Sequence, residues 1–280
     1  MKTPEQLKGA IRNIAKENDL QANEVLHLFL FERLLERLSI SSYKNNLILK
    51  GGLLISSLIG VAGRTTMDMD LTAEEISMEE ENIKAVFKSI FAIDTGDGIK
   101  FDFERLTTIR TKDQHKNFRI YFTASYGKIQ TKMKIDTTSG DVITPGPMEY
   151  SFITLFKEKS IPIMAYTLET IIAEKYLSII KLGTANTRAR DFYDLYKIFH
   201  LYKERIKKTH LKLAIKRTAI KRNVLDVFKE SKNIITEISN DPTIKNLWQN
   251  YANEYSYASN INFKDAIKSL TAIDNLIKES

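Results

Sequence analysis

The stretch that decides the fold lies at residues 47–71, LILKGGLLISSLIGVAGRTTMDMDL. Residues 47–49 are an apolar run that predicts a short buried strand, and residues 53–58 predict a helix directly after Gly51-Gly52. Two glycines between a strand and a helix let the backbone approach a ligand closely, and the first N–H groups of the helix can bind an anion such as phosphate. Glycine pairs are also common in purely structural turns, so this pair alone leaves both interpretations open.

The end of the same stretch alternates apolar and acidic residues. This alternation over residues 67–71 predicts a half-buried strand with Asp68 and Asp70 on one face. Two carboxylates about 7 Å apart along a strand repel each other unless a cation lies between them, and Mg²⁺ prefers oxygen ligands. An exposed strand face with two solvated acids would show the same pattern.

A third carboxylate follows in the middle of the chain. Residues 99–105, 118–126 and 128–136 have the composition of strands, and Gly127 predicts a tight hairpin turn between the last two. Asp136 lies on the polar face at the end of this hairpin. On a strand beside the first acidic pair, it would complete a site for one or two metal ions that hold a nucleoside triphosphate.

The remaining pattern predicts the fold class. Thr3-Pro4 and Asn23 are expected to begin two N-terminal helices. Residues 152–156 and 161–166 are short strand candidates, and from residue 167 onward the pattern is helical. Helices and strands followed by helices alone predict an α/β or α+β fold with a mixed sheet and two lobes, at residues 1–166 and 167–280. The breaks expected in the helical part lie near Gly183, Thr209 and Asp241-Pro242.

A lysine lies on the apolar stripe of the first helix in the second lobe. Lys175 has helical spacing from Leu168, Ile172 and Ile179. An ammonium group among apolar side chains is costly unless it meets anions, and a triphosphate in a cleft would supply them. The alternative is a lysine whose side chain extends past the edge of the core to water.

The next helix carries a further charged group. Asp191 and Asp194 are three residues apart on one helical face, and Arg188 precedes them. In the functional interpretation these residues lie at the mouth between the two lobes. In the structural interpretation, Arg190 and Asp194 form an ordinary surface ion pair.

Positive charge is concentrated in the last third of the chain. The protein has 42 Lys and Arg against 35 Asp and Glu, and residues 201–280 hold 15 of the basic and 9 of the acidic residues. This asymmetry indicates a polyanionic partner such as RNA, although a solvated helical face would have the same composition. The candidates for RNA contacts are Lys207, Lys208, Lys212, Lys216 and Arg217.

Aromatic residues gather near the end of the chain. Trp248, Tyr251, Tyr255 and Tyr257 lie close together in the sequence. Such rings can stack RNA bases, but packing between helices is the favoured interpretation of this cluster.

Composition excludes several classes of protein. With 43% hydrophobic and 28% charged residues, the 280-residue chain is not a disordered or fibrous protein. The absence of cysteine excludes disulfides and thiolate metal sites. No apolar run approaches the ~18 residues of a membrane span, and the polar N-terminus lacks the apolar centre of a signal peptide. We therefore expect a soluble cytoplasmic protein without membrane contact.

Four motifs in this order resemble one family. The order of glycine pair, helix, Asp-x-Asp strand and later lone Asp is similar to the nucleotidyltransferase fold shared with DNA polymerase beta. The full set resembles the AbiEii-type nucleotidyltransferase toxins, also called the domain-of-unknown-function 1814 group. The motifs are Lys50-Gly51-Gly52-Leu53-Leu54 with Arg64-x-Thr66-x-Asp68-x-Asp70, then Ile135-Asp136, Glu174-Lys175, and Arg188-x-x-Asp191-x-x-Asp194-Leu195.

The resemblance implies an activity and partners. Such proteins are toxins of bacterial toxin–antitoxin pairs, and some act in abortive infection against phage. They use Mg²⁺ to transfer nucleotides from a nucleoside triphosphate, and relatives modify the 3′ end of transfer RNA and so block translation. The antitoxin is typically a winged-helix repressor encoded beside the toxin.

The resemblance also suggests roles for the site residues. Gly51, Gly52 and Thr66 would contact the triphosphate. Asp68 and Asp70 would bind the metal, and Asp136 would either complete the metal site or accept the proton of the attacking 3′-hydroxyl. Catalytic support would come from Lys175 and Asp191, and nucleotide contacts from Lys175, Arg188 and Asp194.

Two other functions fit the sequence. The acceptor could be a protein hydroxyl or a small molecule, with the same transfer chemistry. Alternatively, the chain could be a non-catalytic module that binds nucleotides or nucleic acid, although the presence of Asp68, Asp70 and Asp136 favours an enzyme.

Overall fold

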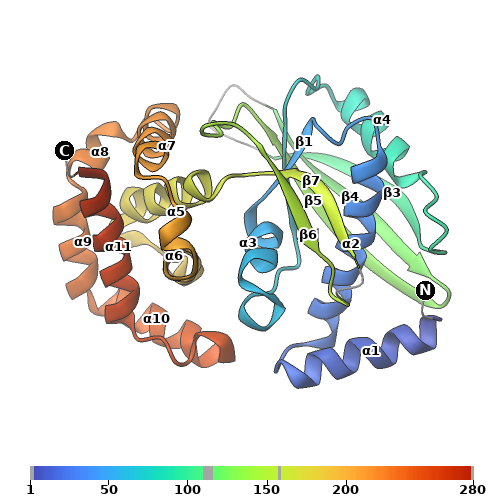
Figure 1. The fold of residues 1–280 in the computed structure, drawn as a ribbon, viewed down its shortest axis with the longest axis horizontal. Helices are drawn as coiled ribbons and strands as arrows, with labels where there is room; N and C mark the ends of the chain where they lie inside the picture. Colours follow the sequence, from blue (N-terminus) through green and yellow to red (C-terminus); the bar gives the residue numbers. More distant parts are fainter. Residues whose placement is uncertain (1–2, 110–115, 157–158, 279–280) are drawn as a thin grey trace. The chain divides into compact units, whose positions relative to one another are not determined.

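The structure is a computed structural model that describes residues 3–109, 116–156 and 159–278. It contains a seven-stranded mixed sheet and helices α1 to α11 (Figure 1). The strands are β1 (Leu47–Lys50), β2 (Met69–Ala73), β3 (Lys100–Ile109), β4 (Asn117–Tyr126), β5 (Ile129–Ser139), β6 (Met148–Ile153) and β7 (Ser160–Ala165). The helices are α1 (Pro4–Glu17), α2 (Ala22–Ile40), α3 (Gly51–Ile59), α4 (Glu80–Phe91), α5 (Leu168–Leu182), α6 (Ala189–Tyr202), α7 (Lys208–Lys221), α8 (Leu225–Lys229), α9 (Ser231–Asn240), α10 (Pro242–Glu254) and α11 (Phe263–Lys278).

The chain divides into two compact units. The first contains residues 1–141 and 148–165, and the second contains residues 142–147 and 166–280. Residues 142–147 join the second unit because the backbone of Thr144 exchanges hydrogen bonds with the hydroxyls of Thr167 and Thr170 at the start of α5. This short segment therefore belongs with helices that follow it in the chain.

The sheet of the first unit has the order β3-β4-β5-β2-β1-β7-β6. The pairs β2–β5 and β1–β7 are parallel, and the other neighbours are antiparallel. The predicted strands at residues 47–49, 118–126 and 128–136 are confirmed, and the hairpin turns at Gly127, which has a φ of 56°. Strand β1 and the following helix α3 confirm the predicted strand–glycine–helix unit.

One face of the sheet is apolar. Successive strand residues point to opposite faces, so alternate residues of β4 and β5 are buried together. Phe122 on this face packs against Phe91 of α4, with their ring centroids 4.8 Å apart. Helices α2 and α4 therefore cover the apolar face, while the opposite face presents the polar residues described below.

The first helix begins as its sequence predicts. Pro4 is its first residue, and the Thr3 hydroxyl accepts a hydrogen bond from the backbone N–H of Gln6. The Gln6 side chain accepts one from the N–H of Thr3 in return. This reciprocal pair satisfies N–H groups that the helix itself leaves unpaired.

The second helix begins two residues earlier than predicted. Asn23 does not cap it, because α2 starts at Ala22 and Gln21 occupies the capping position without a side-chain hydrogen bond. The helix is stabilised instead by burial, since Leu30 and Phe31 are almost wholly inaccessible to water. Local capping chemistry was therefore a poor guide to this boundary.

Three further boundaries differ from the prediction. Strand β2 begins at Met69, so Asp68 lies just before it; the Thr66 hydroxyl accepts the N–H of Asp68 in a local turn. Strand β5 continues past Asp136 to Ser139, because its last residues pair with β2. Strand β6 ends at Ile153, and the N–H of Leu155 bonds to a side chain of α2 instead of to a strand.

The second unit contains helices α5 to α11. Helix α5 is its centre and packs against α6 and α7. Its buried Tyr176 donates a hydrogen bond of 2.5 Å to Asp274 of α11, which also accepts one from Ser231 of α9. The break predicted near Thr209 lies earlier, because α7 already starts at Lys208 and the N–H of Lys207 bonds to Glu169.

The helices were also compared with the requirements of a membrane span. In the three described segments, none of the helices is both long enough and apolar enough to cross a bilayer.

Candidate active site

The glycine turn at the end of β1 is shaped by a carboxylate. Gly51 has a φ of 64°, and a Cβ atom placed on it would lie 2.0 Å from Asp70 Oδ2. A Cβ on Gly52 would lie 2.7 Å from the hydroxyl oxygen of Thr66. Both positions therefore require glycine, the first for its backbone conformation as well as for space. The side chains that approach the backbone of this turn closely are those of Asp70 and Thr66.

Four charged residues form a row across neighbouring strands. Lys50 of β1 pairs in register with Asp70 of β2, Asp70 pairs with Asp136 of β5, and Asp136 pairs with Arg119 of β4. Directly opposite residues on neighbouring strands share one face of the sheet. The row therefore places two carboxylates side by side with a basic residue at each end.

The Asp70 carboxylate of this row binds a proton more readily than an ordinary aspartate does. Burial raises the pKa of Asp70, and the negative charges of Asp136 and Asp68 raise it further, while Lys50 and the N–H of Gly52 act in the opposite direction. The net effect is a raised pKa. The three predicted acids are thus close enough for their charges to act on one another.

The two other acids are held by basic side chains. Asp136 accepts two hydrogen bonds of 2.7 Å from the guanidinium of Arg119, and Asp68 Oδ1 lies 2.9 Å from the ammonium of Lys134. The hydrogen bonds to Asp136 raise the pKa of Arg119. Across the described part of the chain, no group of three or more His, Cys, Asp or Glu side chains is arranged to hold a metal ion.

A second, partly buried charge cluster lies beside the row. Asp141 Oδ2 lies 2.5 Å from the ammonium of Lys50 and accepts hydrogen bonds from the hydroxyls of Thr72 (2.7 Å) and Thr138 (2.5 Å). Burial alone would raise the pKa of Asp141, but Lys50 and the two hydroxyls outweigh it and lower the pKa to about 2. Asp141 is therefore ionised and anchors Lys50 next to Asp70.

Arg119, Lys134, Thr138 and Asp141 were not among the predicted site residues. Arg119 and Lys134 could have been recognised, since they lie on the same polar face of the predicted hairpin as Asp136. Thr138 lies beyond the predicted end of that hairpin, on the part of β5 that pairs with β2. Asp141 follows the hairpin outside any periodic pattern, so no local signal marked it.

The second unit contains its own charged cluster. The ammonium of Lys175 on α5 lies 2.6 Å from Asp191 and 3.0 Å from Asp194, both on α6. Burial would lower the pKa of Lys175, but the charges of Asp194 and Asp191 outweigh it and the pKa is raised. The structure thus brings together the three residues that the sequence selected from two helices. The alternative surface pair of Arg190 and Asp194 is wrong, because Asp194 is fully buried against Lys175.

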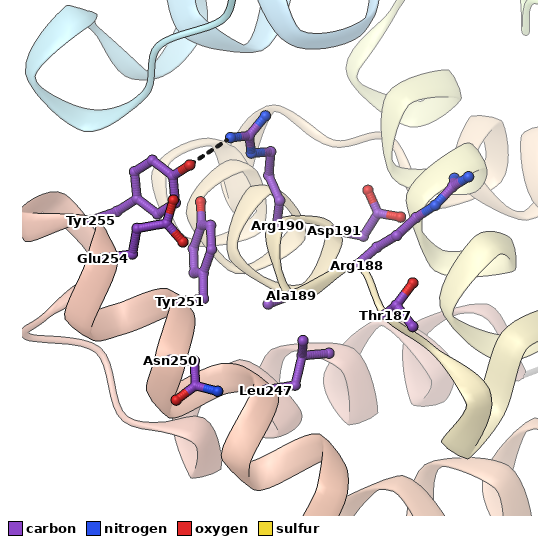
Figure 2. Close-up of a pocket in the computed structure, with 10 residues that line it drawn as sticks. All are labelled: Thr187, Arg188, Ala189, Arg190, Asp191, Leu247, Asn250, Tyr251, Glu254 and Tyr255. Atoms are coloured by element: carbon purple, nitrogen blue, oxygen red, sulfur yellow. Dashed lines mark hydrogen bonds between the residues drawn. The ribbon is translucent and has the colours of Figure 1, made fainter. Parts of the chain in front are cut away.

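Arg188 lies apart from this ion-pair cluster. Together with Asp191 it lines a cavity of about 410 Å³ between the start of α6 and α10 (Figure 2). Figure 2 shows Arg190 turned toward Tyr255 and Arg188 extending on the other side of Asp191. The cavity joins two predicted site residues to the aromatic cluster near the end of the chain.

The sequence was compared with models of known families. Residues 33–269 match the family described as nucleotidyl transferase AbiEii toxin of type IV toxin–antitoxin systems. The chain belongs to the AbiEii family. This match covers most of the chain and confirms the resemblance that the four motifs carry.

Solved structures support the fold of this AbiEii protein. It is similar to the crystal structure of a putative nucleotidyltransferase from H. pylori, with a TM-score of 0.51 and 15% sequence identity over 92% of this chain and 98% of that one. It is equally similar to JHP933 from Helicobacter pylori, with a TM-score of 0.51 and 15% identity over 92% of this chain and 95% of that one. A comparison with curated proteins found no match. At this identity the likeness concerns the fold.

The basic residues chosen from the sequence lie in or just before one helix of the AbiEii protein. Lys207 precedes α7, and the other four candidates lie within it. Lys207, Lys216 and Arg217 are exposed, whereas Lys208 and Lys212 are half-buried. Helix α7 therefore presents positive charge to solvent, as an RNA contact requires.

Proposed function

We propose that this AbiEii protein transfers nucleotides from a nucleoside triphosphate to the 3′ end of an RNA, with transfer RNA as the acceptor. Such a reaction in the cytoplasm would block translation, as expected of a toxin. In this proposal the first unit is the polymerase-beta-like lobe. The observation that carries the proposal is the row in which Asp70 and Asp136 lie side by side next to the Gly51-Gly52 turn.

The three carboxylates are of the ligand type that magnesium prefers, but among the described residues they are not arranged around one metal position in this structure. Asp68, Asp70 and Asp136 are oxygen donors; burial is the largest cause of the raised pKa of Asp70, and repulsion from Asp136 and Asp68 adds to it. A divalent cation would offset this repulsion. Because Lys134 and Arg119 hold Asp68 and Asp136 in this structure, the ion competes with two basic side chains for the same oxygen atoms. Bound there, magnesium would polarise the reacting phosphate and lower the pKa of the attacking hydroxyl.

The chain's own residues supply the binding of the triphosphate. The N-terminal N–H groups of α3 follow the glycine turn and can donate to phosphate oxygens. The Thr66 hydroxyl lies beside Gly52 and can donate a further hydrogen bond. Lys50 lies across from Asp70, and its charge favours the ionised form of that carboxylate.

The second unit supplies a half-buried positive charge. Lys175 carries an ammonium group fixed by Asp191 and Asp194, so its charge has a defined position. In the proposed reaction this charge offsets the negative charge that develops on the triphosphate. The two carboxylates then act as positioning residues for Lys175.

The partners follow from the family and from charge. The family is that of type IV toxin–antitoxin systems, so we propose an antitoxin partner, of the winged-helix type. The exposed basic residues of α7 favour an RNA acceptor over a small molecule.

Substitution of Asp70 tests the proposal. We expect Asp70→Asn to reduce transfer from a labelled triphosphate to RNA by at least ~100-fold with magnesium present, because it removes one charged donor from the centre of the row. Asp102→Asn on β3 is the matched control, since Asp102 is exposed and outside the row. Each triphosphate is supplied in turn with total RNA, and the labelled 3′ ends are sequenced.

The outcomes separate the possible functions. Full activity of Asp70→Asn would refute the assigned active site. Label on a protein or small molecule instead of RNA would keep the chemistry and change the acceptor. RNA binding without any transfer would indicate a non-catalytic module.

A further inference from the structure

The polar face of the sheet continues beyond the charged row onto strands β3, β4 and β5, which form one end of the sheet (Figure 1). From Asp136 toward the hairpin turn, the next residues of β5 on this face are Lys134 and Lys132, which lie opposite Tyr121 and Thr123 of β4. Two residues along a strand span about 7 Å. The polar side chains next to the row are therefore one short step from Asp136.

A bulge in β3 places an arginine on this polar face. Asp102 pairs with Thr123 and Arg105 pairs with Tyr121, so β3 has one residue more than β4 between these two pairs. Without the extra residue, Glu104 would lie opposite Tyr121 and Arg105 would alternate onto the apolar face. Bulges are frequent next to active sites, where they redirect a side chain. This bulge turns Arg105 toward the polar face, directly opposite Tyr121.

The arginine is held against the tyrosine ring. The guanidinium carbon of Arg105 lies 3.7 Å from the centroid of the Tyr121 ring, which is a direct contact. The Tyr121 hydroxyl is hydrogen-bonded to Arg119, and Arg119 donates two hydrogen bonds of 2.7 Å to Asp136. Arg105 itself is exposed. A chain of contacts therefore connects an exposed guanidinium to the proposed active site.

An exposed guanidinium supported by a ring offers a planar cation to a ligand. Unpaired RNA bases stack on arginine planes as well as on aromatic rings. Such stacking tolerates any base, because every base has a π-face. The pair of Arg105 and Tyr121 therefore suits an unpaired base better than it suits a phosphate alone.

The charges around the pair indicate where the phosphates of such a ligand would lie. On β5, Lys132 is exposed and the Lys134 side chain is 37% exposed. On β3, the exposed acids Asp102 and Glu104 precede Arg105. An anionic backbone is attracted to the lysines and repelled by the acids. It is therefore expected to follow β5, with a base above Arg105.

The order of the strands places the arginine on the side of the acceptor. In the proposed function the triphosphate lies at the Gly51-Gly52 turn, which follows β1. The sheet continues from β1 through β2, β5 and β4 to β3, so Arg105 lies at the far end from this turn. In an in-line displacement, the attacking and leaving oxygens lie on opposite sides of the transferred phosphorus. The attacking hydroxyl is therefore expected to arrive from the side of β4 and β3.

We propose that Arg105, supported by Tyr121, stacks against a base at the single-stranded 3′ end of the acceptor RNA, with Lys132 beside the phosphates. This inference rests on the proposed function and deepens it by naming residues that position the acceptor. A base-paired end does not fit, because its bases are stacked within the duplex and are not accessible to the guanidinium. The site differs from helix α7, whose exposed charges would contact phosphates only.

Binding of a short single-stranded RNA tests the contact without any transfer. Fluorescence anisotropy of the labelled RNA is measured with the full-length protein in magnesium-free buffer. Arg105→Ala should weaken binding by about 5- to 150-fold, the loss expected for one stacked base. Arg105→Lys keeps the charge without the plane, so its affinity should lie closer to that of Arg105→Ala than to that of the wild type.

The controls separate stacking from charge and from folding. Arg12→Ala in α1 removes an exposed arginine outside the sheet and should bind the RNA as the wild type does. Circular dichroism shows that each variant is folded. A blunt RNA duplex has no unpaired base, so its affinity should be the same for the wild type and Arg105→Ala. An equal loss of affinity for both RNAs would show a contact with phosphate alone and would overturn the stacking proposal.

Kinetics distinguish the acceptor from the triphosphate. In the transfer assay, Arg105→Ala should raise the KM for RNA and leave the KM for the triphosphate unchanged. A rise in the KM for the triphosphate alone would assign Arg105 to the base of that nucleotide and overturn the acceptor site.

The results also distinguish failure of this site from failure of the proposed function. Wild-type RNA affinity in folded Arg105→Ala, or no binding of RNA by the wild type, would overturn the site even if Asp70→Asn abolished transfer. Conversely, Asp70→Asn should bind the single-stranded RNA no more weakly than the wild type. RNA binding that depends on Arg105 in a protein that transfers no nucleotide would leave this site standing and overturn the transferase proposal.

Discussion

The Asp141 carboxylate provides the sharpest test of the electrostatics around the charged row. It is ionised because Lys50, Thr72 and Thr138 all donate to it. Replacing it by asparagine keeps the size of the side chain and removes the charge. The ammonium of Lys50 then loses the carboxylate that lies 2.5 Å from it, and this loss is expected to destabilise the end of β1.

The magnitude follows from the pKa of Asp141. Its pKa is lowered from 3.8 to about 2, and the side chain is only 24% exposed. A shift of this size corresponds to about 2 kcal/mol of stability at pH 7, since one pKa unit is worth ~1.4 kcal/mol. We therefore expect Asp141→Asn to lower the free energy of unfolding by about 2 kcal/mol at neutral pH.

The lowered pKa of Asp141 also predicts how the stability difference changes with pH. A carboxyl group whose pKa is lowered by folding stabilises the folded state above its unfolded pKa of 3.8, and this contribution disappears as the pH falls toward 2. Urea unfolding of both proteins between pH 7 and pH 3 measures it. The difference between them should be constant above about pH 5 and shrink to about half at pH 3.

The exposed pair of Asp226 and Lys229 supplies the control. Asp226 is 94% exposed in its ion pair, so Asp226→Asn should leave the unfolding free energy unchanged. The assignment of Asp141 is refuted if Asp141→Asn is as stable as the wild type at pH 7. It is equally refuted if the difference between the two proteins does not depend on pH.

Two further substitutions test the turn and the packing of α2. Gly51→Ala should destabilise the protein by about 1–3 kcal/mol in thermal unfolding and abolish transfer, because the φ of 64° disfavours alanine and its Cβ would collide with Asp70. Gly9→Ala in α1 is the control and should not destabilise the protein, because a Cβ there meets nothing within 4 Å. A stable, active Gly51→Ala would contradict the turn geometry. Arg37→Ala should cost about 3–5 kcal/mol in urea unfolding, because buried Arg37 makes two hydrogen bonds to Asp97 and its loss leaves that carboxylate unpaired. A loss below ~1 kcal/mol would show that water replaces the guanidinium at Asp97.

Local sequence patterns predicted the elements that carry the site. The apolar run before Gly51-Gly52, the acidic alternation at Asp68 and Asp70, and the hairpin that bears Asp136 were all recognisable, because each depends on neighbours within a few residues. The boundaries were less predictable. Strand β5 extends beyond Asp136 because β2 pairs with it, and this partner is distant in the sequence.

By itself, the sequence determined which acids, glycines and lysine are available for chemistry, and it identified the family through the order of its four motifs. Only the tertiary structure decided how they pair: Lys50 bonds to Asp141 across 91 positions of the chain, Arg119 and Lys134 hold two of the acids, and Lys175 is fixed by the neighbouring helix. Strand register and helix packing bring these groups together, and both arise from burial of apolar faces across the whole fold, which no local window of sequence contains.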